Sequence, residues 1–183
     1  MTTQSVAALG HSPAETVGED SQQTVRQDLV RYVPARTGPA YWGPGNQLTF
    51  LITGKETGGA FFLSEMSVQP GGGPPPHIHR REDESFHILE GTLTIQVGGN
   101  TITASAGDFA FLPRGIVHSF KNTGDGCAKA LVLTTPAGLE NYFAEVFESA
   151  ADRNSAPPPP SKAMMMRAMA AAPRYDLELL PPA

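Results

Sequence analysis

The sequence of 183 residues predicts an all-β, antiparallel fold with helices near the C-terminal end. Three observations predict this class, of which the first is that 19 glycines and 17 prolines divide the chain into short segments. Several of these segments alternate polar and apolar residues with a period of two, as half-buried strands do. Beyond Pro136, apolar residues recur at helical spacing instead. Many short strands joined by glycine-rich turns indicate a sandwich or a barrel.

The predicted strands are short and follow one another at close spacing. The segment TLTIQV (92–97) shows the alternation clearly, and the tight turn GGN joins it to TITASA (101–106). The turn-rich segment 36–47 carries the single tryptophan, Trp42. The predicted strands are residues 28–35, 48–54, 60–70, 85–91, 92–97, 101–106, 107–115, 117–122 and 128–136.

Two helices and a last strand are predicted after these strands. Residues 137–151 form an amphipathic helix, because apolar side chains recur there at helical spacing. A proline-rich linker with polyproline II bias follows. Residues 162–172 (KAMMMRAMAAA) are rich in helix formers, Pro173 ends this helix, and YDLELL (175–180) is expected to form the strand. The methionines are interpreted as packing residues or a dimer contact.

One folded domain with a tail is predicted. Residues 1–27 are polar and show no clear period, so they are expected to form a disordered tail. Residues 28–147 are assigned to the β-fold and the helix that follows it. Residues 148–183 are assigned to the linker, the C-terminal helix and the short strand. No internal repeat is visible, so one such fold is expected rather than two.

Composition argues against several classes of function. The net charge is −5 and the 13 basic residues form no stripe, which argues against nucleic acid or an anionic membrane as a partner. The single cysteine, Cys127, excludes an intrachain disulfide. The N-terminal segment lacks a signal-peptide pattern, and no apolar run approaches the roughly 20 residues of a membrane span. A cytoplasmic location is therefore expected.

The segment PPPHIHRREDESFHILEG (74–91) concentrates the chemistry of the chain. His77 and His79 are two residues apart, so on an extended strand both imidazoles point to one face. Glu84 follows past a turn and His118 follows a corner made by LPRGIV, and returning strands would bring both to the same metal. Three imidazoles and one carboxylate suit Mn, Fe, Co, Ni, Cu or Zn better than Mg or Ca. The alternative for the histidine pair alone is a solvated surface feature.

Two spaced motifs resemble those of the cupin family. The first motif is matched by GGGPPPHIHRREDESFHILEG at its glycine, histidine and glutamate positions, which are Gly71, His77, His79, Glu84 and Gly91. The second is matched by GDFAFLPRGIVHSFKN, with His118 at the position of a ligand. The resemblance implies an antiparallel, jelly-roll β-barrel that holds one divalent transition metal inside. The implied metal ligands are His77, His79, Glu84 and His118.

The carboxylate ligand has a rival in the sequence. The first motif tolerates three or four intervening residues, so Asp83 is an alternative to Glu84. Glu84 is favoured because it keeps the spacing to the last glycine of the motif and shares a face with Phe86. Glu82 has the same parity but is assigned to the turn. His87 has the opposite parity, so it is expected to face away from the metal, as a surface, sheet-packing or subunit-contact residue.

Residues 38–182 further resemble single-domain cupins of the quercetinase type. This resemblance implies flavonol 2,4-dioxygenation, in which O2 opens the heterocycle with loss of carbon monoxide. Glu84 would be the catalytic base that takes the proton of the flavonol 3-hydroxyl. The candidate contacts with a flat aromatic substrate are Tyr41, Trp42, Phe86 and Phe120. The phenylalanines interpreted as core residues are Phe86, Phe109, Phe111 and Phe120.

Two other functions stay open at this point. The chain could be another metal-dependent cupin enzyme, a diketone or enediol oxygenase or isomerase, or a non-catalytic cupin that binds a metal or a small molecule. The expected partners are a small-molecule substrate and O2, without nucleic acid or membrane. Single-domain cupins commonly dimerise, so a homodimer is expected, with 28–35 and 175–180 as candidate edge-covering strands.

Overall fold

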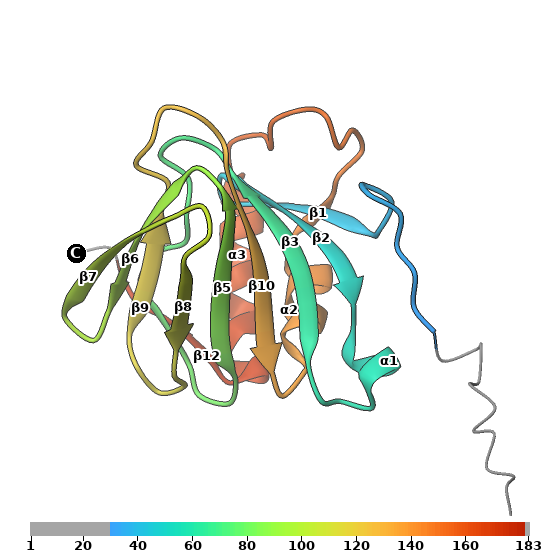
Figure 1. The fold of residues 1–183 in the computed structure, drawn as a ribbon. Helices are drawn as coiled ribbons and strands as arrows, with labels where there is room; N and C mark the ends of the chain where they lie inside the picture. The colour runs from blue at the N-terminus through green and yellow to red at the C-terminus, as the bar shows by residue number, and fades with distance from the viewer. Residues whose placement is uncertain (1–29, 182–183) are drawn as a thin grey trace, which may run out of the picture. The chain divides into compact units, whose positions relative to one another are not determined.

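The structure is a computed structural model that describes residues 30–181 (Figure 1). The tail predicted over 1–27 lies outside the described residues, as do the first two residues of the strand predicted over 28–35. Residues 30–35 form no strand, so this part of the prediction is wrong. The segment contains Pro34, which cannot donate a ladder hydrogen bond.

Two antiparallel sheets make up the fold. The order is β11-β1-β2-β3-β10-β5-β8 in one sheet and β12-β4-β9-β6-β7 in the other. The strands of the first sheet are β1 (Ala40–Gly43), β2 (Asn46–Ile52), β3 (Phe62–Val68), β5 (Asp83–Glu90), β8 (Phe109–Leu112), β10 (Ala128–Thr135) and β11 (Glu148–Ser149). Those of the second sheet are β4 (His77–His79), β6 (Thr92–Val97), β7 (Asn100–Ser105), β9 (His118–Lys121) and β12 (Leu177–Leu179).

The all-β, antiparallel fold class is confirmed, with one refinement. Within the described residues the two sheets share no ladder that would close them into one barrel, so the fold is a two-sheet jelly roll. The sequence analysis missed β1, because its segment has the glycines and prolines of a turn. It also missed the four-residue helix α1 (Gly54–Thr57), whose first turn is capped by Thr53 and Glu56.

The main core lies between the sheets and follows from residue alternation. Every second residue of β3 and of β10 is buried, so each strand presents one apolar face to the interior. The prediction that Phe109 and Phe111 are core residues is wrong, because Phe109 is 66% exposed and Phe111 is 55% exposed. Both lie on β8, an edge strand whose inward positions are taken by Ala110 and Leu112.

The C-terminal segment forms a second apolar cluster with two helices. They are α2 (Leu139–Val146) and α3 (Lys162–Ala171), followed by a short 3-10 helix (Ala172–Tyr175) and β12. The side chain of Ser161 caps α3 by accepting a hydrogen bond from the backbone N–H of Met164. Figure 1 shows both helices behind β5 and β10. Among the described residues, no helix combines the length and the apolar character needed to cross a membrane.

The final strand predicted over 175–180 is present as β12, and its position matters for the site. β12 pairs with β4, so Leu177 lies opposite His79 and Leu179 lies opposite His77. On its other side β4 pairs with β9, where His77 lies opposite His118. The C-terminal end of the chain therefore supports the strand that carries two of the candidate metal ligands.

Candidate metal centre

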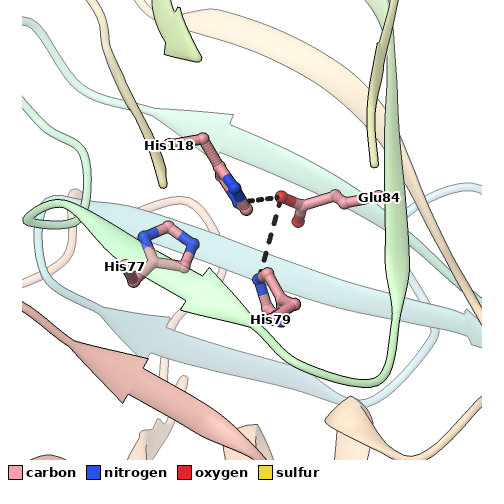
Figure 2. Close-up of side chains that lie close together, drawn as sticks. All are labelled: His77, His79, Glu84 and His118. Carbon is pink, nitrogen blue, oxygen red and sulfur yellow. Dashed lines mark hydrogen bonds and ion pairs between the residues drawn. The ribbon is translucent and has the colours of Figure 1, made fainter. Parts of the chain in front are cut away.

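The structure brings together the four residues for which the sequence predicts a metal site. His77 and His79 lie on β4, His118 begins β9, and Glu84 points inward from β5 (Figure 2). One donor atom of each residue lies within 4.8 Å of a donor atom of every other. The strands come from both sheets, so the cluster exists only because the jelly roll stacks one sheet on the other.

Glu84 lies at the centre of the contacts in this cluster. Its Oε2 atom is 3.2 Å from Nε2 of His118 and 4.0 Å from Nε2 of His79 (Figure 2). All four side chains are buried. Two donors held about 2.1 Å from one ion lie at most about 4.2 Å apart, so the widest pair in the cluster must close by at least several tenths of an ångström around a metal.

Two histidines are oriented by backbone carbonyls. Nδ1 of His77 lies 2.9 Å from the carbonyl oxygen of Pro75, and Nδ1 of His118 lies 3.0 Å from that of Ile116. A carbonyl oxygen only accepts hydrogen bonds, so in each pair Nδ1 carries the hydrogen and donates it. Nε2 is left with a free lone pair in the neutral ring, which is the form that binds a metal.

His79 has a different neighbour, which the sequence analysis assigned to the turn. Nδ1 of His79 and Oε2 of Glu82 are 3.9 Å apart, and neither has a hydrogen-bond partner among the described residues. Glu82 is only 1% exposed, and burial raises the pKa of its carboxyl group to about 7. A buried carboxylate facing a ligand histidine is the usual arrangement for orienting the ring, and the shared parity of Glu82 and Glu84 was the available signal.

The protonation states follow from burial and from mutual contact. Burial, with the neighbouring His118, lowers the pKa of His77 to about 3, and burial also lowers the pKa of His79. Burial, the largest single influence, opposes ionisation of Glu84, but the hydrogen bond with His118 and the charges of the three histidines together lower the pKa of the carboxyl group. Burial likewise opposes protonation of His118, yet the contact with Glu84 raises its pKa. The proton that this pair holds must leave before a metal can bind.

Asp83 and His87, the other candidates near the cluster, point elsewhere. Asp83 accepts hydrogen bonds from the backbone N–H, Nε and Nη2 of Arg114, at 2.9, 3.0 and 2.7 Å. This pairing lowers the pKa of Asp83 to about 2. His87 is exposed on the opposite face of β5, as its parity predicts. The Asp83–Arg114 pair ties the start of β5 to the loop before His118.

The donor set fits a divalent transition metal. It offers three imidazole nitrogens and one carboxylate oxygen, and two of the imidazoles are already oriented with Nε2 toward the common centre. Nitrogen-rich sets of this kind suit Mn, Fe, Co, Ni, Cu or Zn, whereas Mg and Ca prefer oxygen ligands. The residues therefore could hold one such ion.

An apolar cavity of about 90 Å³ adjoins the cluster and is lined in part by His77, His79 and Glu84. Of the four predicted substrate contacts, only Phe120 lines this cavity. Phe86 is fully buried in the core, and Tyr41 packs against Phe50. Trp42 instead donates a hydrogen bond from Nε1 to Gln47. The aromatic residues that sequence reasoning missed are Phe62, Tyr142, Phe143 and Phe147.

The C-terminal layer, which consists of α2, α3, the 3-10 helix and β12, forms one wall of this cavity. Met165 and Ala168 reach it from α3, and Leu177 and Leu179 reach it from β12. Helical spacing predicted α2 and the content of helix formers predicted α3, but neither pattern indicated what the helices would cover. The cavity thus has candidate metal ligands on one part of its lining and apolar side chains of the C-terminal layer on another.

Comparison with known proteins places this geometry in context. Residues 64–134 match the cupin domain family, which supports the cupin superfamily. Germin-like protein 5-1 of Oryza sativa subsp. japonica is 43% identical over 68 residues, which are 34% of this chain and 31% of that protein. Quercetin 2,3-dioxygenase of Aspergillus japonicus is 29% identical over 147 residues, 76% of this chain and 41% of that protein. The chain thus spans less than half the length of either relative.

Two solved structures share the fold. A predicted oxalate decarboxylase from Thermotoga maritima superposes with a TM-score of 0.54 at 22% identity, covering 57% of this chain and 98% of that one. The polyketide cyclase RemF from Streptomyces resistomycificus gives a TM-score of 0.51 at 26% identity, covering 58% and 79%. These similarities support the cupin fold, which a predicted oxalate decarboxylase and a polyketide cyclase thus share.

Proposed function

Taking a cupin fold with a buried imidazole–carboxylate cluster as the premise, we propose that the protein is a metal-dependent dioxygenase that opens the heterocycle of a flavonol such as quercetin. The observation that carries the proposal is that His77, His79 and Glu84, three of the four clustered residues, line an apolar cavity. The partial similarity to quercetin 2,3-dioxygenase supports the choice of substrate.

The cluster supplies the acid–base chemistry of this proposal. A divalent ion held there would act as a Lewis acid and lower the pKa of a hydroxyl group of the substrate. Glu84 is the proposed catalytic base, because it is a buried carboxylate whose lowered pKa keeps it ionised. His77 and His118 keep their orientation through their bonds to backbone carbonyls, so the site is preorganised.

The cavity supplies orientation and excludes water. Its walls come mainly from aliphatic and aromatic side chains, among which Phe62, Phe120 and Phe143 offer flat surfaces to an aromatic ring. Such a lining holds the substrate by burial of apolar area. The reacting groups are then confined to the end where Glu84 lies.

The cavity volume favours a second candidate. An engineered cavity of about 150 Å³ accommodates benzene, so a volume of about 90 Å³ is too small for a flavonol unless the C-terminal layer moves. A small diketone or enediol is closer to this size. The second candidate is therefore a metal-dependent cupin oxygenase or isomerase that acts on such a compound.

One experiment separates these functions. The metal-free protein is loaded in turn with Mn, Fe, Co, Ni, Cu and Zn, and consumption of quercetin and of 2,4-pentanedione is followed under O2, with carbon monoxide measured in the gas phase. Loss of quercetin with release of carbon monoxide supports the flavonol dioxygenase. Consumption of the diketone with quercetin untouched supports an oxygenase of the second kind, and a metal-loaded protein that consumes neither compound contradicts both dioxygenase candidates.

The homodimer also stays a proposal. Phe109 and Phe111 are exposed on the edge strand β8, and burial of such side chains favours association. Light scattering of the wild type and of a Phe109→Ser, Phe111→Ser variant tests it. A monomeric mass for the wild type at micromolar concentration contradicts it.

A further inference from the structure

Two buried hydroxyl groups on the cavity wall lack a hydrogen-bond partner in the described part of the chain. Their oxygen atoms are Oγ of Ser64 and Oγ1 of Thr134. Ser64 is 1% exposed and Thr134 is 0% exposed, and both line the cavity beside the candidate metal centre. Other hydroxyls of the chain do find partners, as Thr135 does by donating a 2.9 Å hydrogen bond to the carbonyl oxygen of Ala60.

Both hydroxyls lie on the inner face of the larger sheet, close to the candidate metal ligands. Thr134 on β10 is the register partner of Glu84 on β5. Ser64 on β3 is the partner of Val132, one inward position further along β10. The two residues are thus diagonal neighbours on adjacent strands, and residues of such a pair lie roughly 7–8 Å apart, with their Cβ atoms somewhat closer. One rigid molecule held beside Glu84 can reach both.

A buried hydroxyl without a partner is unfavourable, because it loses its hydrogen bonds with water and gains none. Valine has nearly the shape of threonine, and alanine nearly that of serine, so an apolar wall was available at these positions. Unpaired buried polar groups concentrate where a ligand supplies the missing partner. The location of both groups on one cavity wall points to such a ligand.

We infer that Ser64 and Thr134 are specificity-determining residues that hydrogen-bond oxygen substituents of the substrate, and that the substrate is a flat apolar compound with hydroxyl or carbonyl groups beyond those at the metal. This inference rests on the proposed function, since it assumes a small molecule in the cavity. It deepens that function by distinguishing a polyhydroxylated substrate from one that carries only metal-binding oxygens.

The test compares two flavonols with full-length protein loaded with Zn²⁺ and kept without O2, so that binding is measured without turnover. 3-Hydroxyflavone carries only the neighbouring hydroxyl and keto groups, whereas quercetin adds further ring hydroxyls. Titration calorimetry gives the Kd of both for the wild type, Ser64→Ala and Thr134→Val. Thr134→Ser is the matched control that keeps the hydroxyl, and thermal unfolding of each variant without ligand reports on the fold.

The wild type is expected to bind quercetin more tightly than 3-hydroxyflavone. Ser64→Ala and Thr134→Val should each reduce this preference by about tenfold, the loss of one hydrogen bond, while Thr134→Ser retains most of it. The Tm of both apolar variants should equal or exceed that of the wild type, because an unpaired polar group has been removed. A structural role for the hydroxyls predicts the reverse, a lower Tm with the preference unchanged.

The outcomes separate this inference from the proposed function. Turnover of both flavonols with a preference that neither variant alters overturns the inference and leaves the dioxygenase standing. A preference that collapses in the variants, without turnover under O2 with any of Mn, Fe, Co, Ni, Cu and Zn, supports the inference and removes the dioxygenase. If the metal-loaded wild type binds neither flavonol, both are wrong.

Discussion

The two apolar clusters of the molecule contribute different things to the candidate site. The cluster between the sheets surrounds strands that carry all four predicted metal ligands and both unpaired hydroxyls. The C-terminal cluster, built from α2, α3 and β12, contributes apolar side chains such as Tyr142, Met165 and Leu177. The strands around the first cluster are joined by long antiparallel ladders, such as those of β3 with β2 and β10. The elements of the second cluster are held by side-chain packing and by the three-residue pairing of β12 with β4.

The two layers meet at one strand of the candidate site. Glu84 lies on β5, which has long ladders with β10 and β8, so its backbone has little freedom. His77 and His79 lie on β4, which is paired over three residues with β12 and at one position with β9. The wall that must move for a large ligand belongs to the layer with fewer ladder contacts, as low-stability regions of functional proteins often do, and a movement of β12 would also release β4.

The largest effect is expected from His118→Ala. It removes one of the four donors and also the hydrogen-bond partner of Glu84. We expect metal affinity to fall by more than about 100-fold, beyond the effect of losing an orienting neighbour of a ligand. Elemental analysis after dialysis measures it, with exposed His87→Ala as the control. Unchanged metal content in His118→Ala means that the four-ligand site is wrong.

Next comes Met164→Ala in the C-terminal layer. Met164 is 2% exposed in the second cluster, so truncation should lower the free energy of unfolding of this layer by about 2–5 kcal/mol. Met166, in the same MMM run, is 63% exposed and is the matched control, with little change expected. Hydrogen exchange should show lost protection in α2, α3 and β12 and retained protection in β3 and β10. Equal loss in all five elements would show that the two layers unfold as one unit.

Glu82→Leu should weaken metal binding without removing a donor. Glu82 faces the unpaired Nδ1 of His79, so its loss leaves that ring free to turn. We expect the Kd for Zn²⁺ to rise by about 10–100-fold. Glu82→Gln keeps an oxygen acceptor and should show the smaller change. If the wild type, Glu82→Gln and Glu82→Leu bind Zn²⁺ with the same Kd, Glu82 does not orient the His79 ring.

The smallest effect is expected from Glu145→Gln, which should change the Tm in a pH-dependent way because Glu145 has exposed contacts with Arg174 and Tyr175. This residue of α2 accepts a 2.8 Å hydrogen bond from the hydroxyl of Tyr175 and pairs with Arg174. The bond from Tyr175, with Arg174, lowers the pKa of Glu145 in the folded protein. Its contribution is therefore fully present above the unfolded pKa and disappears as pH falls through the lower, folded value.

Comparing Glu145→Gln with the wild type tests this sign. The difference in Tm should be small near pH 7, because exposed ion pairs contribute little. It should shrink toward zero as the solution is acidified below pH 4. A difference that grows on acidification contradicts the assignment.

Several parts of the candidate site could be predicted from the sequence because they depend on the spacing of nearby residues. The HxH pair, the glutamate after the turn and the histidine after a glycine–proline corner are short patterns. The preference for Glu84 over Asp83 followed from strand parity, and the structure gives Asp83 to Arg114 instead. Parity also directed Glu82 inward, but its assignment to the turn, which the structure confirms, gave no reason to expect its carboxylate 3.9 Å from His79.

The positions of the aromatic side chains could not be predicted from local spacing. Phe109 and Phe111 have the apolar character of core residues, but which face of β8 is covered depends on strands far along the chain. Trp42 was chosen for its ring, yet its indole bonds Gln47 on the neighbouring strand. The side chains that do line the cavity from α2 came from a helix whose position the periodicity could not give.

The order of residues alone predicts the antiparallel fold class, the helical character of the C-terminal segment and the four residues of the candidate metal cluster. These follow from periods of two and of 3.6 residues and from the fixed chemistry of imidazole and carboxylate. The tertiary structure was needed to show that β12 supports β4, that α3 covers the cavity, and that Ser64 and Thr134 lie unpaired on the same cavity wall. Those facts depend on contacts between residues as far apart in the chain as His77 and Leu179, which local periodicity does not encode.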